Sequence, residues 1–314
     1  MPDIAFVAVD WGTTHFRAWS VDRAGMALSM RHSSQGMSTL RRDDYGAILE
    51  AHLEQLGAAP DVPVVICGMA GSRQGWREAA YLPTPCKLDR LGQGATRFEM
   101  GKRAIAILPG VAQRHPTAPD VMRSEETQVL GLVSQGVTDT AVCMPGTHTK
   151  WVRVAQGAIT DFHTAMVGDL FCVLKRETIL RHSVDGGTVD AHGEAFAGGV
   201  RDALAAPHLV LPSLFQLRAG GLLFDTPADA TLSRLSGLLI GLDIAALTHG
   251  DNPADQVQLV GGNALGAAYR TALHMAGIGV DEHDGEALAL AGLVSIGGQL
   301  WPERMINPSH RKTA

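Results

Sequence analysis

Two segments of the chain place a glycine-threonine turn between runs of apolar and β-branched residues. In the first, AFVAVDWGTTHFRAW, Asp10 ends the first run, and Gly12, Thr13 and Thr14 follow it. Backbone N–H groups and hydroxyls in such a turn can bind phosphate, and a carboxylate beside them can hold Mg²⁺ directly or through water. The segment predicts either a nucleotide phosphate site with Asp10 at the metal, or a surface hairpin that the aspartate caps.

The second segment, DTAVCMPGTHTKWVR, repeats this pattern. Gly146 corresponds to Gly12, and Thr147 corresponds to Thr13. Each pattern is typical of a strand, a tight turn and a second strand. One such hairpin is common, but two related hairpins about half a chain apart indicate a duplicated lobe with a ligand between the halves.

The second turn differs from the first in its charge. Met144 occupies the position that Asp10 holds in the first segment. One acidic and one neutral turn suit a single metal ion, because a second carboxylate would repel the phosphates. Gly146, Thr147 and His148 are the candidate phosphate ligands here, although an exposed loop histidine would look the same.

A third motif combines a β-rich run with two glycines. The run 256–260 leads into Gly261, Gly262 and Asn263, and a helical pattern follows. Glycines let a flat ring lie close to the backbone, and the start of a helix favours anions. We therefore expect these three residues to contact a flat ring, such as that of adenosine.

Glu125 and Glu126 form an acidic pair at the start of an expected helix, 125–134, for which Ser124 is the expected N-cap. Adjacent helical side chains point about 100° apart, so only one of the two carboxylates can enter a site. A capped helix with an acidic first turn, stabilised by the helix dipole, explains the same residues without chemistry.

The elements that must position these motifs alternate between strand and helix, as in an α/β protein. Further β-rich runs lie at 62–67 and 105–108, and helical patterns at 232–247, 264–275 and 287–300. With 314 residues, 46% of them hydrophobic, the chain can form two cores. We expect an N-terminal lobe at 1–120 and a C-terminal lobe at 121–314, and leave open whether the last helix returns to the first lobe.

The composition excludes several classes of partner. A formal net charge of −6 argues against binding of nucleic acid or an anionic membrane surface. The four cysteines have no CxxC spacing, which is typical of buried thiols in a reducing compartment. No basic leader precedes the first apolar run, and no apolar segment is long enough to span a bilayer. We expect a cytoplasmic protein.

Taken in order, DWGTT, GMAG, EET, PGTHTKW, SGLLIGLD and VGGN resemble the sugar-kinase branch of the actin/hexokinase superfamily. This resemblance implies two ribonuclease H-like lobes, with mixed sheets flanked by helices around a central cleft. VMRSEETQ, MPGTHTKW and DFHTAMVGDL are more specifically similar to the 2-dehydro-3-deoxygalactonokinase family, over nearly the whole chain. That similarity implies phosphorylation of the C6 hydroxyl of 2-dehydro-3-deoxy-D-galactonate by ATP and Mg²⁺, in galactonate catabolism.

The resemblance also implies a catalytic base. In hexokinases the base is an Asp followed by Thr, and Glu126-Thr127 is the matching pair in this sequence. The glutamate is one methylene longer than the residue that the superfamily pattern contains. Glu125 and Asp169 therefore remain alternative bases.

An anionic sugar acid requires a guanidinium for its carboxylate. The arginines near the motifs are Arg17, Arg73, Arg77 and Arg123. We favour Arg17 and Arg123 for substrate binding, because they flank the first turn and the expected base.

The segment GMAGSRQGW is the remaining candidate for substrate contact. We expect Gly71, Ser72 and Trp76 from this segment in the sugar pocket. A tight strand-to-helix turn with Trp76 packed in the core is the alternative.

Other functions fit part of the pattern. Another sugar kinase of the superfamily would share the motifs, although the zinc-binding CxCGxxGCxE segment of repressor-related kinases is absent from the sequence. A polyphosphate hydrolase or an ATPase switch would keep both hairpins without a base for a sugar hydroxyl. A filament or scaffold subunit would polymerise with ATP. We expect a small-molecule partner, and the sequence leaves open whether the chain forms a homo-oligomer.

Overall fold

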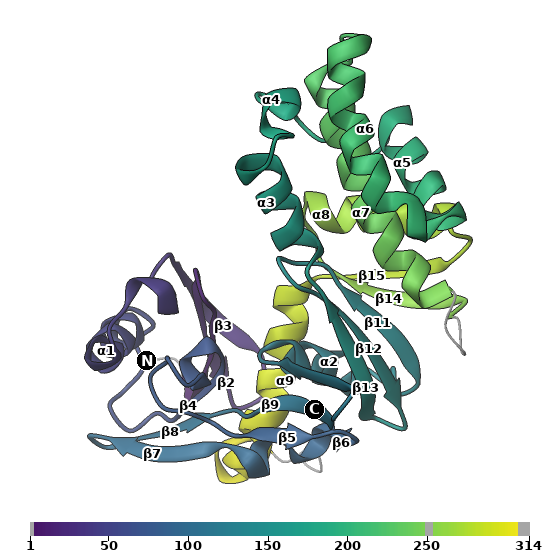
Figure 1. The fold of residues 1–314 in the computed structure, drawn as a ribbon. Coiled ribbons are helices and arrows are strands. Elements are labelled where there is room, and N and C mark those ends of the chain that lie inside the picture. The colour runs from purple at the N-terminus through teal and green to yellow at the C-terminus, as the bar shows by residue number, and fades with distance from the viewer. Residues whose placement is uncertain (1–2, 249–253, 307–314) are drawn as a thin grey trace. The chain divides into compact units, whose positions relative to one another are not determined.

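The computed structural model describes residues 3–248 and 254–306. The chain forms two compact units, whose elements are labelled in Figure 1. Unit 1 contains residues 1–139, 154–162 and 285–314, and unit 2 contains residues 140–153 and 163–284. Residues 121–139 and the last helix therefore belong to the same unit as the N-terminal strands.

Unit 1 is built on a mixed sheet with the strand order β3-β2-β1-β4-β8-β7, and a smaller sheet has the order β10-β9-β5. The strands are β1 Ile4–Trp11, β2 Phe16–Asp22, β3 Ala27–Ser33, β4 Val64–Gly68, β5 Tyr81–Pro83, β6 Cys86–Lys87, β7 Thr96–Met100, β8 Arg103–Ile107, β9 Gly110–His115 and β10 Ala118–Met122. The α-helices are α1 Tyr45–Gln55, α2 Glu125–Ser134 and α9 Gly285–Leu300. The hairpin and helix expected from the sequence at 5–19 and 125–134 are confirmed.

Strand β1 is buried along its whole length because helices cover both faces of the sheet. On one face Val7 and Val9 pack into a core with Leu49 of α1. On the other face Phe6 contacts α9, where Gly297 leaves no room for a side chain against the phenyl ring. The end of β1, which carries Asp10, is therefore held rigidly in the centre of the sheet.

The register of β1 decides what lies beside Asp10. Its antiparallel partner β2 places Arg17 opposite Asp10, and its parallel partner β4 places Cys67 there. Gly12 to His15 form the tight turn between β1 and β2, in which the Gly12 N–H donates to the His15 carbonyl at 2.9 Å. The first glycine-threonine turn thus follows directly from a buried strand end.

Helix α2 joins unit 1 through close packing on α9. A side chain at Gly131 would clash with the Leu288 backbone, and one at Gly292 would clash with the Thr127 backbone. Only glycine permits this approach of two helix backbones. The start of α2, with Glu125 and Glu126, is therefore fixed within the same unit as Asp10.

Unit 2 contains a second sheet with related topology. Its strands are β11 Thr140–Met144, β12 Thr149–Ala155, β14 Gln256–Val260 and β15 Gly279–His283, and β13 Ala158–Ala165 continues the chain into unit 1. Its helices are α3 Val167–Glu177, α4 Arg181–Val184, α5 Glu194–Ala205, α6 Val210–Leu223, α7 Ala228–Thr248 and α8 Ala264–Met275. Along the sheet β15-β14-β11-β12-β13-β6, the order β13-β12-β11-β14-β15 repeats the order β3-β2-β1-β4-β8 of the first sheet.

The repeat extends to strand direction. Strand β1 pairs in parallel with β4, and β4 with β8; β11 pairs in parallel with β14, and β14 with β15. In both sheets a hairpin lies on one side of the central strand and parallel strands lie on the other. The duplicated, mixed sheets flanked by helices that the sequence indicated are therefore confirmed.

The core of unit 2 lies between its sheet and its helices. Figure 1 shows α5, α6 and α7 side by side, and α5 and α6 each contact α7. Glycines at 199, 237 and 241 bring the backbones of α5 and α7 together. The apolar segment expected to be helical at 232–247 thus forms the central helix of this unit.

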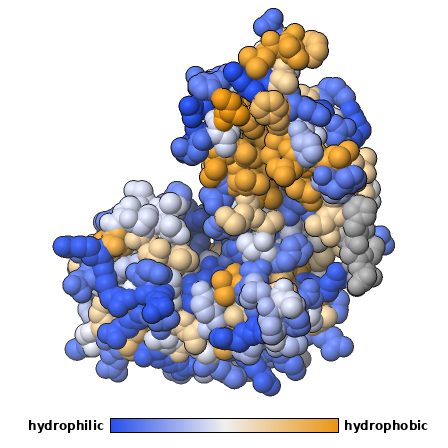
Figure 2. Space-filling model, in the orientation of Figure 1, coloured by the Kyte–Doolittle hydropathy of each residue, from blue (hydrophilic) through white to orange (hydrophobic). Residues whose placement is uncertain are grey.

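Helix α6 leaves a large apolar surface exposed, visible as the continuous orange area in Figure 2. Only Val210 and Leu217 of α6 are fully buried. The exposed apolar side chains at α6 and its ends are Leu209, Leu211, Phe215, Leu222, Leu223 and Phe224. Packing within unit 2 therefore does not account for this face. Among the described residues, no helix combines the length and the apolar character needed to cross a membrane.

Candidate active site

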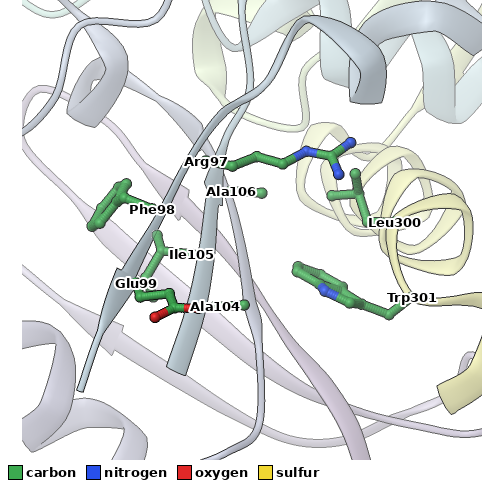
Figure 3. Close-up of a pocket in the computed structure, with 8 residues that line it drawn as sticks. All are labelled: Arg97, Phe98, Glu99, Ala104, Ile105, Ala106, Leu300 and Trp301. Atoms are coloured by element: carbon green, nitrogen blue, oxygen red, sulfur yellow. The ribbon is translucent and has the colours of Figure 1, made fainter. Parts of the chain in front are cut away.

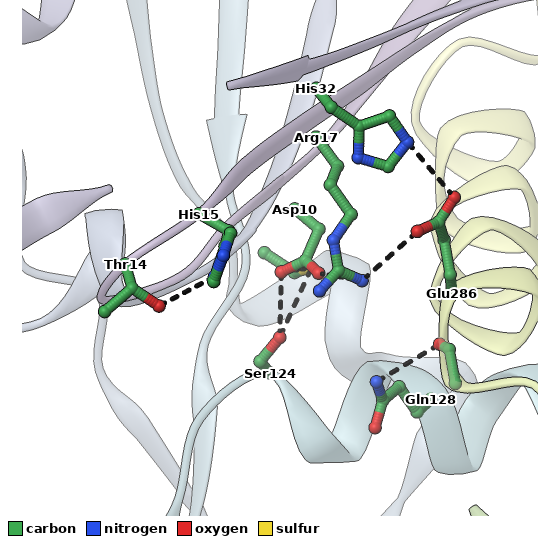
Figure 4. A network of polar contacts seen from close by, with 10 residues as sticks. Asp10, Thr14, His15, Arg17, His32, Ser124, Gln128 and Glu286 are labelled. Atoms are coloured by element: carbon green, nitrogen blue, oxygen red, sulfur yellow. Dashed lines mark hydrogen bonds and ion pairs between the residues drawn. The ribbon is translucent and has the colours of Figure 1, made fainter. Parts of the chain in front are cut away.

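Asp10 is the centre of a polar cluster at the end of β1 (Figure 4). The residue is only 7% exposed. Oδ1 accepts a hydrogen bond from the Ser124 hydroxyl at 3.1 Å, and the Cys67 thiol lies 3.6 Å from the same oxygen. Oδ2 lies 3.5 Å from Nη1 of Arg17. Three different elements therefore hold the one carboxylate.

Ser124 stands at the N-cap position of α2 but does not cap it. The expected hydrogen bond from the serine side chain to the first turn is absent, because the hydroxyl turns to Asp10 instead. The backbone of Ser124 has φ 97° and ψ −40°, outside the regions that a serine normally adopts. The expectation of an N-cap from its side chain was wrong, and the long-range bond to β1 is the reason.

Glu126 is the buried member of the acidic pair, with 1% of its surface exposed. Its oxygens accept hydrogen bonds from the Ser124 N–H at 3.1 and 3.0 Å, and from the Thr127 hydroxyl at 3.2 Å. Burial raises the pKa of Glu126 to about 8, and the nearby Glu125 carboxylate adds to the rise. Hydrogen bonds and the charge of Arg123 act in the opposite direction. Such a carboxylate can exchange a proton near neutral pH.

Glu125, the alternative base, has a different environment. It is half-buried, and its Oε2 accepts a hydrogen bond from the Arg123 N–H at 3.0 Å. Glu125 and Glu126 therefore point in different directions, as helical geometry requires. Asp169, the other alternative, belongs to unit 2, where it lies 3.8 Å from Nε2 of His148.

Cys67 completes the cluster around Asp10. Its thiol lies 3.8 Å from the Ser124 hydroxyl as well as close to Asp10. Burial raises the pKa of Cys67 well above its usual value, and the carboxylates of Asp10 and Glu126 raise it further. The thiol therefore stays neutral beside the two acidic groups.

Arg17 is held by carboxylates on both sides. Besides Asp10, its Nη1 lies 3.8 Å from Oε2 of Glu286 at the start of α9, and His32 lies 3.6 Å from the other oxygen of Glu286 (Figure 4). Two acidic partners already balance the charge of Arg17. This arrangement suits orientation of Asp10 better than recognition of an incoming anion.

Arg123 is the more isolated arginine. Its side chain is 8% exposed, and Nη2 donates to the Ala79 carbonyl at 2.8 Å. Its guanidinium carbon lies 4.3 Å from the centroid of the Tyr81 ring. Nε and Nη1 are buried without a hydrogen-bond partner. A buried cation with unsatisfied donors is costly, and an anionic oxygen that accepts from one of them would offset part of this cost.

Gly71 lies beside this guanidinium. A β-carbon at residue 71 would come within 2.9 Å of Nη1 of Arg123 and within 2.9 Å of the Ile107 side chain. Glycine at this position therefore lets the guanidinium pack close against the backbone. The structure brings together Gly71 and Arg123, which the sequence assigned separately to the substrate.

Ser72 and Trp76 lie in the same segment but make packing contacts. The Ser72 hydroxyl contacts the sulfur of Met37 at 3.3 Å. The Trp76 ring stacks on Tyr45, with centroids 5.9 Å apart, and meets Phe98 edge to face at 5.0 Å. These contacts fit the alternative prediction, in which Trp76 packs in the core instead of lining the sugar pocket.

The first turn exposes its two threonines. Thr13 and Thr14 are exposed, whereas Gly12 is half-buried. The segment after β3 supports the turn from below: the Met37 N–H donates to the Gly12 carbonyl at 3.0 Å, and the Ser38 N–H donates to the Thr13 carbonyl at 2.9 Å. Hydrogen bonds to its carbonyl oxygens therefore hold the turn in place, and its threonine side chains remain exposed.

The second turn has the corresponding geometry within unit 2. Thr147 and His148 are exposed, and Gly146 is half-buried. The start of α3 packs on the turn, where the Asp169 N–H donates to the Thr147 carbonyl at 3.0 Å, and Gly168 leaves no room for a side chain. Both predicted phosphate turns are thus braced by a neighbouring segment.

A buried network supports the strand that follows the second turn. The Thr149 hydroxyl lies 3.0 Å from the Tyr269 hydroxyl, which donates to Oδ2 of Asp243 at 2.6 Å. The indole N–H of Trp151 donates to the same oxygen at 3.0 Å. Burial raises the pKa of Asp243, although both hydrogen bonds favour its ionised form. This network fixes the relative positions of β12, α7 and α8.

The expected adenosine residues form the turn from β14 to α8. Oδ1 of Asn263 accepts a hydrogen bond from the Gly266 N–H at 3.0 Å and caps α8. A β-carbon on Gly262 would meet no atom within 4 Å. The turn therefore has open space beside Gly262, while the oxygen of Asn263 is occupied by the helix.

A separate cavity of about 350 Å³ lies in unit 1, at the edge of the first sheet (Figure 3). Strands β7 and β8 and the end of α9 line it, with Arg97, Phe98 and Trp301 among the lining residues. None of its lining residues was predicted as a site residue. Arg97 donates to the Gly92 carbonyl at 3.2 Å, so structural contacts account for its orientation.

Comparison with known proteins identifies the family. The model of the 2-keto-3-deoxy-galactonokinase family matches residues 10–296. The chain is 44% identical to the protein named probable 2-dehydro-3-deoxygalactonokinase DgoK1 of Rhizobium meliloti strain 1021, over 95% of this chain and 98% of that protein. The chain belongs to the 2-keto-3-deoxy-galactonokinase family.

Two further comparisons agree with membership in the 2-keto-3-deoxy-galactonokinase family. The 2-dehydro-3-deoxygalactonokinase of Escherichia coli strain K12 is 34% identical over 93% of this chain and 97% of that protein. A crystal structure of a Sinorhizobium meliloti protein with 44% identity has a TM-score of 0.92 and covers 95% of this chain and 99% of that one. The family resemblance expected from the motifs is confirmed, and membership of a kinase family implies ATP as a substrate.

Sequence reasoning missed several residues that contact the predicted site residues. Ser124 was considered only as a helix cap, although its place between Arg123 and the acidic pair was a usable signal. Tyr81 and Glu286 have no signal in the sequence, because they reach Arg123 and Arg17 only through the tertiary fold. The sequence likewise does not show that residue 36 must be glycine, because the turn at Thr14 packs against it only in the folded protein.

Proposed function

We propose that the protein transfers the terminal phosphoryl group of ATP to the C6 hydroxyl of 2-dehydro-3-deoxy-D-galactonate, in galactonate catabolism. The observation that carries this proposal is the family match over residues 10–296, together with two curated relatives that carry this enzyme name. The products would be ADP and the 6-phosphate of the sugar acid.

Glu126 is the base that we propose for this reaction. Its carboxylate is the buried member of the acidic pair, and its raised pKa of about 8 makes it a proton acceptor matched to neutral or mildly alkaline conditions. It would accept the proton of the attacking C6 hydroxyl as the phosphorus–oxygen bond forms. The remaining catalysis in phosphoryl transfer comes from positioning and electrostatic stabilisation.

Asp10 would hold Mg²⁺, which neutralises phosphate charge when bound. The donor set fits this ion: one carboxylate accepts a hydrogen bond from the Ser124 hydroxyl, exposed threonines lie in the turn that follows it, and Mg²⁺ retains several waters and phosphate ligands. Within residues 3–248 and 254–306, no group of three or more His, Cys, Asp or Glu side chains could hold a metal alone. This agrees with an ion that arrives with ATP.

The two glycine-threonine turns are the proposed phosphate ligands. Gly12, Thr13 and Thr14 in unit 1, and the corresponding turn 146–148 in unit 2, each present exposed polar groups on a braced backbone. The open space beside Gly262 supports binding of the adenosine ring at the turn 261–263.

Arg123 is the proposed anchor for the substrate carboxylate. Two of its buried guanidinium nitrogens have no hydrogen-bond partner, and one of them, Nη1, lies next to Gly71, where an oxygen of the substrate carboxylate could accept a hydrogen bond. Glu126 is close enough to Arg123 for the guanidinium charge to favour its ionised form. The carboxylate and the reacting hydroxyl of one sugar acid would thus lie near Arg123 and Glu126, at the start of α2.

A coupled assay tests the function. The protein is incubated with ATP, Mg²⁺ and a panel of 2-keto-3-deoxy sugar acids, and ADP release is followed together with ³¹P and ¹³C spectra of the product. We expect strong stimulation by 2-dehydro-3-deoxy-D-galactonate and a phosphate ester at C6. ADP release that is independent of the sugar acid, or phosphorylation of a neutral sugar only, would overturn the proposal.

A further inference from the structure

The strongest remaining feature of unit 1 is the backbone of Ser124. Three non-glycine residues among those described have positive φ: Ser124 at 97°, and Gln156 and Asp225 at 51°. The latter two angles fall in the left-handed helical range, whereas φ 97° with ψ −40° does not. Such strain persists only where surrounding contacts require it, and it is concentrated at functional sites.

The strained conformation gives Ser124 two contacts at once. Its N–H donates to both oxygens of Glu126, at 3.1 and 3.0 Å. Its hydroxyl donates to Oδ1 of Asp10 at 3.1 Å, across 114 residues of sequence (Figure 4). A relaxed N-cap would turn the hydroxyl toward the first turn of its own helix and would release Asp10.

We propose that Ser124 is a positioning residue that sets the separation of Asp10 and Glu126 in the kinase reaction. The proposal rests on the proposed function, which places Mg²⁺ at Asp10 and the base at Glu126. One residue then holds both carboxylates, the first through its side chain and the second through its backbone.

Ser124 hydrogen-bonds to both Asp10 and Glu126, which distinguishes it from the neighbouring groups. Arg17 contacts Asp10 but not Glu126, and Thr127 contacts Glu126 but not Asp10. Cys67 lies near the Ser124 hydroxyl and Asp10, yet its thiol is a weak donor at 3.6 Å. Loss of the Ser124 hydroxyl therefore frees Asp10 on the side that faces α2.

Ser124→Gly and Ser124→Ala separate positioning from stability. Glycine adopts positive φ without strain, so Ser124→Gly keeps the N–H contact to Glu126, removes the hydroxyl and relieves the strain. Ser124→Ala removes the hydroxyl and keeps the strain. We expect Ser124→Gly to unfold at the same temperature as the wild type or higher, and at a higher temperature than Ser124→Ala.

The activity of the variants should depend on the Ser124 hydroxyl and not on their unfolding temperature. We expect both variants to lose about 10- to 100-fold in kcat, because displacements of about 1 Å at a reacting centre can cost about 10²-fold. Calorimetry should also show weaker binding of a non-hydrolysable ATP analogue in the presence of Mg²⁺, and little change without Mg²⁺. Ser20→Ala is the matched control. The buried Ser20 hydroxyl belongs to the sheet that contains Asp10 and lies 2.7 Å from the Ser29 hydroxyl. Its removal should leave kcat and Mg²⁺-dependent binding unchanged.

Each outcome is decisive. Wild-type kcat and Mg²⁺-dependent binding in Ser124→Gly would overturn the proposal and leave Ser124 as a structural link only. A loss of activity in Ser124→Ala alone would assign the effect to folding, and would overturn it as well. Absence of sugar-stimulated turnover in the wild type would instead sink the proposed function, so the two failures are distinguishable.

Discussion

The guanidinium of Arg123 lies over the ring of Tyr81, 4.3 Å from its centroid, while two of its nitrogens remain buried without a partner. An aromatic face stabilises a cation but does not satisfy its N–H groups. The third nitrogen, Nη2, donates to the Ala79 carbonyl and fixes the orientation of the group. Nε and Nη1, which lie on different edges of the guanidinium, therefore remain as donors for an anionic oxygen.

Replacement of Arg123 by lysine should impair binding of the sugar acid specifically. Lysine keeps the charge but loses the oriented Nε and Nη1 donors, and hydrogen bonds to charged groups contribute about 1.5–3 kcal/mol. We expect the KM for the sugar acid to rise about 10- to 100-fold, with the KM for ATP nearly unchanged, in steady-state assays that vary each substrate.

Arg77→Lys is the control for this arginine. The exposed Arg77 also lies over an aromatic ring, 4.4 Å from the centroid of Phe98. Its replacement should leave both KM values unchanged. Equal effects of the two substitutions would contradict a specific role for Arg123.

Replacement of Glu126 by glutamine should reduce kcat by about 10²- to 10⁴-fold and change the affinity for ATP little, because general-base catalysis contributes on this scale. In the wild type, turnover should rise with pH through an apparent pKa near 8, since the base must be deprotonated to act. The pH profile of kcat in the wild type and the variant checks both points.

Glu125→Gln provides a second check on the base. The Glu125 carboxylate raises the pKa of Glu126, so its removal should lower the apparent pKa of the kcat profile while most turnover is retained. If Glu125→Gln abolishes turnover and Glu126→Gln does not, the base is Glu125.

The same pKa shift predicts how stability depends on pH. The ordinary pKa of 4.5 in the unfolded chain is raised to about 8 on folding, so between these values the folded protein binds the extra proton. Stability from this group is therefore fully present below pH 4.5 and is lost as the pH rises toward 8. Glu126→Gln should become more stable than the wild type as the pH rises, by on the order of 1.4 kcal/mol per pH unit at most.

Urea unfolding of both proteins at pH 6 and pH 8.5 measures this difference. Other ionisable groups cancel in the comparison because they are shared. A constant difference between the two proteins across this range would show that Glu126 titrates near its ordinary pKa.

Gly36→Ala should distort the first phosphate turn. A β-carbon at residue 36 would lie within 2.5 Å of the Thr13 carbonyl oxygen and 2.6 Å of the His15 nitrogen. Gly36 itself has φ −77°, so the penalty is steric and not conformational. We expect the KM for ATP to rise at least about 10-fold, because misplaced phosphate donors lose their pre-organisation.

Gly298→Ala is the matched control for the steric argument. It lies in α9, and its β-carbon would meet only a Met305 atom at 3.8 Å. Alanine in a helix is favoured over glycine by about 0.5–1 kcal/mol, so this variant should be slightly more stable and fully active. Unchanged ATP kinetics in Gly36→Ala would contradict the assignment of the turn to phosphate.

Local patterns were sufficient for the elements that carry the motifs. The hairpin around Gly12, the helix at 125–134 and the strand at 256–260 all follow from short-range periodicity and turn residues, and the structure confirms them. The same patterns indicated a duplication, which the repeated strand order confirms. Whether the two turns bind one ATP stays a prediction.

The sequence by itself determined the types of residue available for chemistry and the family to which the chain belongs. The tertiary structure alone decided that Ser124 bonds to Asp10, that Glu286 balances Arg17, and that Arg123 keeps two unsatisfied donors. These contacts join segments far apart in the chain. Their formation depends on sheet register and on the packing of α2 and α9, and no local propensity encodes either one.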